Sequence, residues 1–98
     1  MDHLKLTTEH RRLTILRHLA ASPGYTSNGS ILHDVCNGLG VSSTWDQMVG
    51  TLAWLKEQEL VALEAHEQLT IVSATARGVE VANGQASHPG VKRPSARL

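Results

Sequence analysis

Apolar residues recur at helical spacing near the start of the chain. This pattern predicts a helix from Thr8 to about Ala21, with Thr7 as its N-cap and Ser22-Pro23-Gly24 as its stop. The side of this helix that faces the core carries Leu13, Leu16, Leu19 and Ala20. Residues 1–6 precede the cap and are predicted to form an N-terminal arm.

Two more helices are predicted from capping residues and apolar stripes. The second extends from about Asn28 to Gly38, with Asn28 or Ser27 as its N-cap. Its apolar stripe consists of Ile31, Leu32, Val35 and Leu39. The third begins at a capping box formed by Thr44 and Gln47, and it ends near Gln58. Its core face consists of Met48, Leu52 and Leu55.

The second half of the chain changes to β-prone runs and then to a short helix. Residues 60–63 and 69–72 lie on either side of a predicted turn at 65–68, and together they predict a hairpin. Thr75 is placed to cap a last helix from Ala76 to about Ala82, which Asn83-Gly84 terminates. Residues 85–98 have two prolines, a glycine and almost no apolar side chain, which predicts a disordered tail.

The order of these elements predicts one α+β domain over residues 7–84. A chain of 98 residues has room for a single modest core, and with two Trp, one Tyr and no Phe that core has to be aliphatic. Cys36 is the single cysteine and cannot form an internal disulfide. We find no apolar signal segment and no run of transmembrane length, which predicts a cytoplasmic protein that does not contact a membrane.

The charges are unevenly distributed along the chain. Residues 1–84 hold six Lys or Arg against nine Asp or Glu, a formal charge of −3, whereas residues 85–98 hold Lys92, Arg93 and Arg97 and no acid, a charge of +3. Affinity for nucleic acid depends largely on neutralisation of phosphates by cations. An acidic body with a basic tail therefore disfavours DNA as a partner of the folded part.

The order of three helices, a hairpin and a helix resembles the winged helix-turn-helix superfamily. Leu39-Gly40-Val41-Ser42, followed by Leu52-x-x-Leu55-x-x-x-x-Leu60-Val61, is similar to the passage from recognition helix to wing in its ArsR/MarR-type branch. The resemblance implies a three-helix core, a short β-hairpin wing and a short C-terminal helix.

Over nearly its full length the chain also resembles a family of small winged-helix proteins from Mu-like bacteriophages and prophages. The segments that carry this resemblance are residues 2–7, 23–25, 53–58, 76–82 and 89–94. The resemblance implies a DNA-binding function.

Three features depart from the winged-helix pattern. The turn between Gly40 and Met48 is about two residues longer than in a compact helix-turn-helix. Glu59 stands where a glycine commonly follows the recognition helix, so this helix end has to avoid or strain a left-handed backbone. No Arg or Lys occurs from Val41 to Leu55, and the cysteine pair of ArsR-type metal sensors is absent.

By this resemblance, the third helix enters the major groove and its N-terminal turns face the bases. The outward candidates are Trp45, Gln47, Gly50 and Thr51. Gln can pair with adenine, Thr can contact a thymine methyl, and Gly50 would permit close approach. The candidates for phosphate contacts are Arg11, Arg12, Lys92 and Arg93. Asp46 opposes this function because its carboxylate repels phosphate, and the same residues can instead cap the helix or meet a protein partner.

Other side chains suggest chemistry less directly. Trp45 can tuck under the edge of the core, while Trp54 lies off the core stripe and is predicted to pack on the hairpin or at a subunit contact. His33 and Cys36 share a helical face, but a zinc site needs about four ligands. We therefore predict no metal, no cofactor and no catalytic residue, and interpret Cys36 as a small buried apolar residue.

These patterns lead to two hypotheses. In the first, the chain is a phage DNA-binding protein that regulates transcription without catalysis, as a monomer or a homodimer, and binds double-stranded DNA. In the second, it is a protein-interaction module, acting as an assembly or packaging adaptor or as an inhibitor of a host protein. The contact surface is then the third helix and an acidic wing that carries Glu64 and Glu67.

Overall fold

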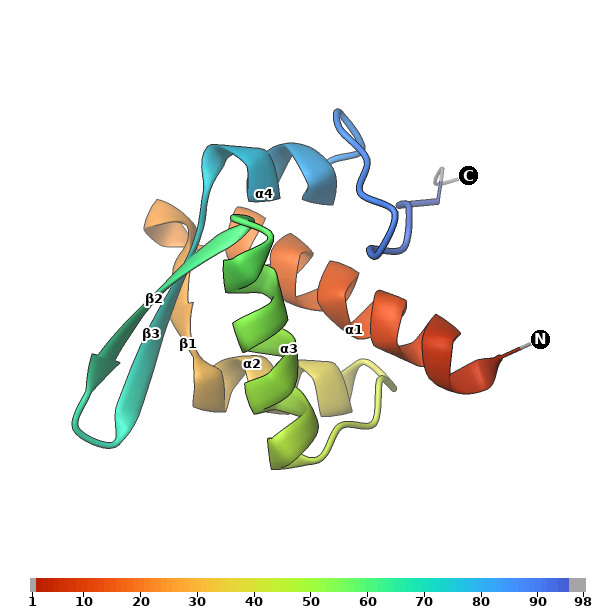
Figure 1. Cartoon of the computed structure of the whole chain (residues 1–98). Coiled ribbons are helices and arrows are strands. Elements are labelled where there is room, and N and C mark those ends of the chain that lie inside the picture. The colour runs from red at the N-terminus through yellow and green to blue at the C-terminus, as the bar shows by residue number, and fades with distance from the viewer. Residues whose placement is uncertain (1, 96–98) are drawn as a thin grey trace.

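The computed structural model describes residues 2–95, and they form four α-helices and a three-stranded antiparallel sheet (Figure 1). The helices are α1 (His3–Ala20), α2 (Gly29–Gly38), α3 (Trp45–Glu57) and α4 (Ala76–Ala82). The strands are β1 (Thr26–Asn28), β2 (Val61–His66) and β3 (Leu69–Ala74), and a 3-10 turn occupies Pro23–Tyr25. The predicted α+β class is confirmed.

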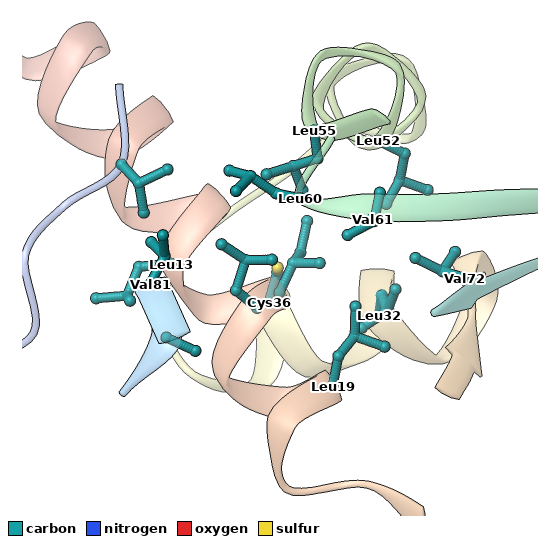
Figure 2. Close-up of a cluster of buried hydrophobic side chains, with 14 of the residues drawn as sticks. Leu13, Leu19, Leu32, Cys36, Leu52, Leu55, Leu60, Val61, Val72 and Val81 are labelled. Atoms are coloured by element: carbon teal, nitrogen blue, oxygen red, sulfur yellow. The ribbon is translucent and has the colours of Figure 1, made fainter. Parts of the chain in front are cut away.

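The core is aliphatic and draws on every helix (Figure 2). Its fully buried side chains include Leu13, Leu16 and Leu19 of α1, Leu32 and Cys36 of α2, Met48 and Leu55 of α3, Leu60 and Val72 of the sheet region, and Val81 of α4. The predicted core faces of α1 and α3 are thus confirmed. The stripe predicted for α2 is partly wrong, because Ile31 and Leu39 are exposed while Cys36 takes the inward position.

Helix α1 begins five residues earlier than predicted. Asp2 caps it, since its Oδ1 accepts hydrogen bonds from the backbone N–H groups of Leu4 and Lys5 at 3.0 and 3.2 Å. The predicted Thr7 cap and the predicted arm at residues 1–6 are therefore wrong for the described residues. A charged Asp at this end also interacts favourably with the helix dipole, and no Gly or Pro interrupts the first turns.

The caps predicted for α2 and α3 are confirmed. Asn28 Oδ1 accepts from Ile31 N at 2.9 Å. In the capping box of α3, Thr44 Oγ1 accepts from Gln47 N at 3.1 Å and Gln47 Oε1 accepts from Thr44 N at 2.9 Å.

The hairpin is longer than predicted, and the sheet has a third strand. Strands β2 and β3 pair from Val61↔Ala74 to His66↔Leu69, so the turn shrinks to residues 67 and 68. Strand β1 pairs with β3 on its other edge and gives the sheet order β1-β3-β2. Its three polar residues carry no apolar alternation, which is why the hydrophobic pattern does not predict it.

Residues 85–95 pack against α1, which makes the prediction of a disordered tail wrong for them. Val91 is buried in the core, Lys92 N donates to Glu9 O at 3.2 Å, and Gly90 O accepts from Arg12 Nη1 at 2.8 Å. In Figure 1 this segment returns from α4 toward α1. Lys92 and Arg93 are exposed on it, whereas Arg97 lies outside the described residues.

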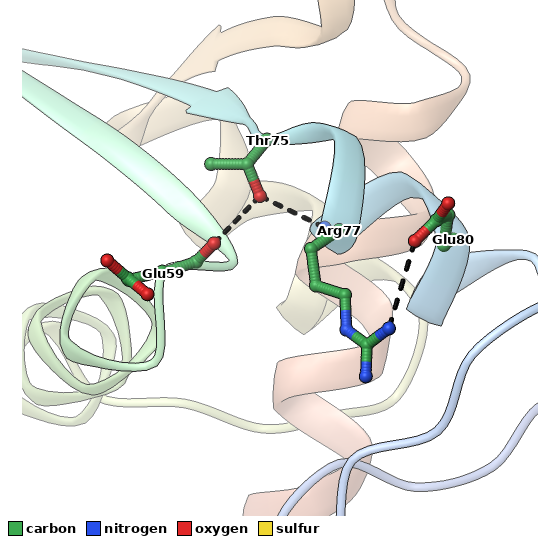
Figure 3. A network of polar contacts seen from close by, with 5 residues as sticks. Glu59, Thr75, Arg77 and Glu80 are labelled. Atoms are coloured by element: carbon green, nitrogen blue, oxygen red, sulfur yellow. Dashed lines mark hydrogen bonds and ion pairs between the residues drawn. The ribbon is translucent and has the colours of Figure 1, made fainter.

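Glu59 ends α3 in the left-handed conformation, with φ at 60°. Leu60 N donates to Leu55 O at 3.0 Å, the bond that closes a Schellman motif. The Glu59 carbonyl accepts from Thr75 Oγ1 at 2.8 Å, and Thr75 also caps α4 by accepting from Gly78 N at 3.0 Å (Figure 3). A strained residue thus connects the end of α3 to the start of α4.

Glu59→Gly is expected to raise the free energy of unfolding by about 1 kcal/mol, because glycine adopts a positive φ without steric cost. The variant can keep every hydrogen bond that the backbone makes between the end of α3 and the start of α4. Urea unfolding followed by circular dichroism measures the change. Glu57→Gly, at an exposed position inside the last turn of α3, is the matched control and should lower stability by about 0.5–1 kcal/mol. A loss of stability in both variants would contradict the strain at Glu59.

Candidate functional site

The structure gathers five of the residues predicted to contact DNA in a groove between α1 and α3. This cavity of about 280 Å³ is lined by Arg11, Arg12, Gln47, Gly50 and Thr51, together with Thr8 and Trp54. The internal contacts of these residues determine whether the groove can bind anything.

Arg11 is turned into the protein and is only 4% exposed. Its Nε donates to Ser43 Oγ at 2.6 Å and its Nη2 to Ser42 O at 3.1 Å. These bonds fasten the loop between α2 and α3 to the side of α1. The guanidinium therefore cannot reach a phosphate backbone in this conformation, contrary to the prediction for Arg11.

Arg12 is likewise held by internal contacts. Its guanidinium carbon lies 3.6 Å from the centre of the Trp54 ring, and its Nη1 donates to Gly90 O. Burial lowers the pKa of Arg12 from its usual value, with Glu9 acting in the opposite direction and Arg11 in the same one. Arg12 thus clamps the C-terminal segment, and its predicted phosphate contact stays a prediction.

Trp54 packs on that segment, whereas the sequence pattern predicted packing on the hairpin or at a subunit contact. The His88 ring meets it edge-on with centroids 5.1 Å apart. His88 Nε2 donates to Gln58 Oε1 at 2.9 Å, while His88 Nδ1 accepts from Gly90 N at 3.0 Å. Residues 85–95 thus have a defined place across α1 and α3.

The base-reading candidates of α3 are not all presented outward. Thr51 is 6% exposed and its hydroxyl donates to Gln47 O at 2.6 Å, so its predicted outward position is wrong. Gln47 is exposed, but its Oε1 already accepts from Thr44 N and lies 3.4 Å from Arg11 Nη2. A bidentate contact to adenine needs that oxygen. Gly50 faces open space, since a Cβ there would meet nothing within 4 Å.

A different side of α3 exposes large apolar groups. Trp45 and Val49 are each 51% exposed, which agrees with the predicted outward position of Trp45. They border an apolar cavity of about 170 Å³ between α3 and the hairpin, which Ala53 and Leu63 also line. His33 meets Trp45 edge-on at 5.5 Å and its Nε2 donates to Ser43 O at 2.7 Å, which fixes the indole in place. We call Trp45, Val49, Ala53 and Leu63 the α3–hairpin surface.

The charge around this surface is negative. Residues 45–69 contain five carboxylates and one lysine, a formal charge of −4, and all six charged side chains are exposed. Asp46 is next to Trp45 on α3, and Glu67 is at the tip of the hairpin. Glu64 is on the opposite face of the hairpin from Leu63 and lies 3.2 Å from His66. Only part of the predicted acidic wing therefore borders the apolar groups.

Sequence comparison gives the chain a phage relative. Gp26 of Escherichia phage Mu, an uncharacterized protein, is 41% identical to it over 92 residues, which cover 94% of this chain and 95% of gp26. The chain belongs to the gp26 family. This confirms the predicted similarity to proteins of Mu-like phages.

A second relative of this gp26 homologue is an uncharacterized protein of Haemophilus influenzae. It is 36% identical over 64 residues, which cover 65% of the present chain and 62% of that protein. No protein-family model matches the gp26 homologue, and no solved structure matches it significantly.

Two other titratable groups of the gp26 homologue, Cys36 and His33, are buried or bonded within the fold. Cys36 is fully buried, and burial raises the pKa of its thiol to about 11, whereas a nucleophilic or metal-binding cysteine needs a lowered pKa. His33 is occupied with Ser43 O. Within residues 2–95 no three His, Cys, Asp or Glu side chains are placed to hold a metal ion, and none of the helices is long and apolar enough to cross a membrane.

Proposed function

We propose that the chain is a non-catalytic protein-interaction module that serves as an adaptor in phage assembly or packaging, or acts on a host protein. Its α3–hairpin surface binds a partner segment that presents apolar side chains flanked by Lys or Arg. One observation carries the proposal: α3 exposes Trp45 and Val49 in an acidic surrounding, while Arg11 and Arg12 are turned inward.

The proposal includes a winged-helix fold. The element order α1-β1-α2-α3-β2-β3 supports it, as does the sheet order β1-β3-β2. In Figure 1, α3 lies beside the hairpin, which supports an assignment of α3 as the recognition helix and of the hairpin as the wing. The fold itself does not fix the partner, because function depends on the side chains at the site.

The chemistry of the α3–hairpin surface favours protein over DNA. Exposed Trp is a frequent anchor of protein interfaces, where apolar groups fill the centre and charges lie at the rim. DNA binding instead requires cations close to the phosphates. Residues 45–55 carry no cation, and Asp46 lies in the first turn of α3. A basic partner gains from both the apolar groups and the carboxylates.

Val49→Asp is expected to weaken binding of a fluorescent amphipathic helix made of Leu and Lys at least about tenfold, a loss of 1.4 kcal/mol or more. The added carboxylate places a charge in the centre of the apolar contact. Fluorescence anisotropy at low salt measures the affinity, and circular dichroism confirms that the variant is folded. A helix made of Leu and Glu is the probe control and should not bind.

Ile31→Asp supplies the matched protein control. Ile31 is 46% exposed on α2, outside the α3–hairpin surface, so this variant adds the same charge at a similarly exposed position. It should bind the Leu and Lys helix as the native chain does. Equal losses in the two variants, or no binding of the peptide by the native chain, would rule out the proposed surface.

Duplex DNA is a second candidate partner, supported by the exposed Lys92 and Arg93, which the packed C-terminal segment holds beside α1. A titration with mixed-sequence duplex DNA at rising salt tests it. If these two cations contact phosphates, replacing both by Gln should reduce the slope of log affinity against log salt by about 2. No binding at low salt would remove this candidate.

A further inference from the structure

The folded chain is electrically polarised. Residues 2–38 and 85–95 together carry six Lys or Arg and three Asp or Glu, a formal charge of +3, in contrast to −4 for residues 45–69. Such opposite charges on one molecule steer association between copies, because the positive part of one is attracted to the negative part of another.

The positive part has a groove of its own, between α1 and α2. This cavity of about 330 Å³ is lined by His10, Thr14, Arg17, His18, Val35 and Leu39. Leu39 is 70% exposed and gives the groove an apolar end. Its polar side holds the cation Arg17. Partial burial and the nearby charges of Lys92 and Arg17 lower the pKa of His10. We call this the α1–α2 groove.

The two surfaces share no residue, because one is formed by α3 and the hairpin and the other lies between α1 and α2. Arg11 and Arg12 face α3 and its preceding loop, whereas His10, Thr14 and Arg17 face α2. A specific interface buries about 800 Å² per partner, roughly an eighth of the 6188 Å² surface of this chain. One copy can therefore be contacted on both surfaces at once.

We propose that the α3–hairpin surface of one copy binds the α1–α2 groove of a second copy, so that the chain associates head to tail. This inference rests on the proposed function, because it uses the same α3–hairpin surface and identifies one partner for it.

The apolar groups and the charges of the two surfaces are complementary. Trp45 and Val49 of one copy cover Leu39 and the neighbouring α2 residues of the next. Asp46 approaches Arg17 and Lys92, two exposed cations of that region. The inward-facing Arg11 and Arg12 add positive charge to the same region without contacting the second copy. Because the two surfaces differ, the contact is heterologous and each copy keeps one of them free for a third. Exposed charge pairs also make the association sensitive to salt.

Two one-sided variants test this arrangement by sedimentation at low salt. Val49→Asp disables the α3–hairpin surface, and Arg17→Glu combined with Leu39→Asp disables the α1–α2 groove; all three side chains are exposed, so both variants should fold. The native chain should grow beyond a dimer as its concentration rises, and salt should reverse this growth. Each variant alone should be monomeric, whereas their mixture should form a one-to-one complex and nothing larger.

A native chain that is monomeric at every concentration would overturn the proposal, as would a native dimer that grows no further or a mixture that stays monomeric. Circular dichroism of each variant excludes misfolding as the cause. The peptide titration separates this inference from the proposed function. If the native chain is monomeric but binds the peptide, the proposed function is supported and self-association is ruled out. If the two variants form a one-to-one complex but the native chain does not bind the peptide, self-association is supported and the proposed peptide binding is not.

Discussion

Replacing Gly78 by alanine is expected to lower the free energy of unfolding by about 3 kcal/mol, close to the upper end for overpacking of a core. A Cβ at this position would lie 2.1 Å from the carbonyl oxygen of Leu60 and 3.4 Å from Cδ2 of Leu16. The clash is with backbone, so no side-chain rotation relieves it. Leu60 O also accepts from Thr75 N at 3.0 Å, which ties the obstructing carbonyl to the start of α4.

Gly50→Ala is the matched control for Gly78→Ala. Both glycines are helical, but a Cβ at Gly50 meets nothing within 4 Å. Alanine there should raise stability by about 1 kcal/mol, because glycine is a poor helix former. Urea unfolding of both variants gives the comparison. If Gly78→Ala stays within about 1 kcal/mol of the native chain, then α4 and the Leu60 backbone are not as closely packed as the structure has them.

The helices and their caps could be predicted because their signals are local. Thr44 and Gln47 are three residues apart and bond as the capping box requires. Met48, Leu52 and Leu55 recur at helical spacing and are all buried. The same holds for Thr75, whose hydroxyl caps α4 as predicted. These features depend on neighbours within one or two turns.

The candidate site could not be predicted in the same way, because its contacts join distant parts of the chain. Arg11 bonds to Ser43 across 32 residues of sequence, and Arg12 bonds to Gly90 across 78. A row of arginines on a helix indicates a solvated or phosphate-binding face unless such partners are known. The exposure of Trp45 and Val49 likewise depends on where the hairpin lies relative to α3.

The order of the C-terminal segment could not be predicted from its composition. Its prolines and glycine indicate disorder, yet a few specific contacts order residues 85–95. Val91 is buried, and Gly90 lies so close to Trp54 that a Cβ would approach the ring to 2.6 Å. The glycine that composition associates with flexibility is the residue that permits this approach.

Trp54→Ala is therefore expected to lower the free energy of unfolding by about 3 kcal/mol, at the low end for such a truncation because the ring is half-buried. The variant loses the ring beneath the Arg12 guanidinium and the edge contact of His88. Residues 85–95 should detach from α1. Urea unfolding measures the stability, and the rate of tryptic cleavage after Lys92 reports the detachment.

Trp45→Ala separates the structural tryptophan from the proposed binding one. Trp45 is 51% exposed, so its removal should cost less than about 1 kcal/mol of stability and leave tryptic cleavage unchanged. It should nevertheless weaken binding of the Leu and Lys helix about tenfold or more, as expected for an exposed aromatic anchor. Equal losses of stability in the two variants would contradict these assignments. Undiminished peptide binding by Trp45→Ala would remove Trp45 from the α3–hairpin surface and leave Val49 as its main apolar contact.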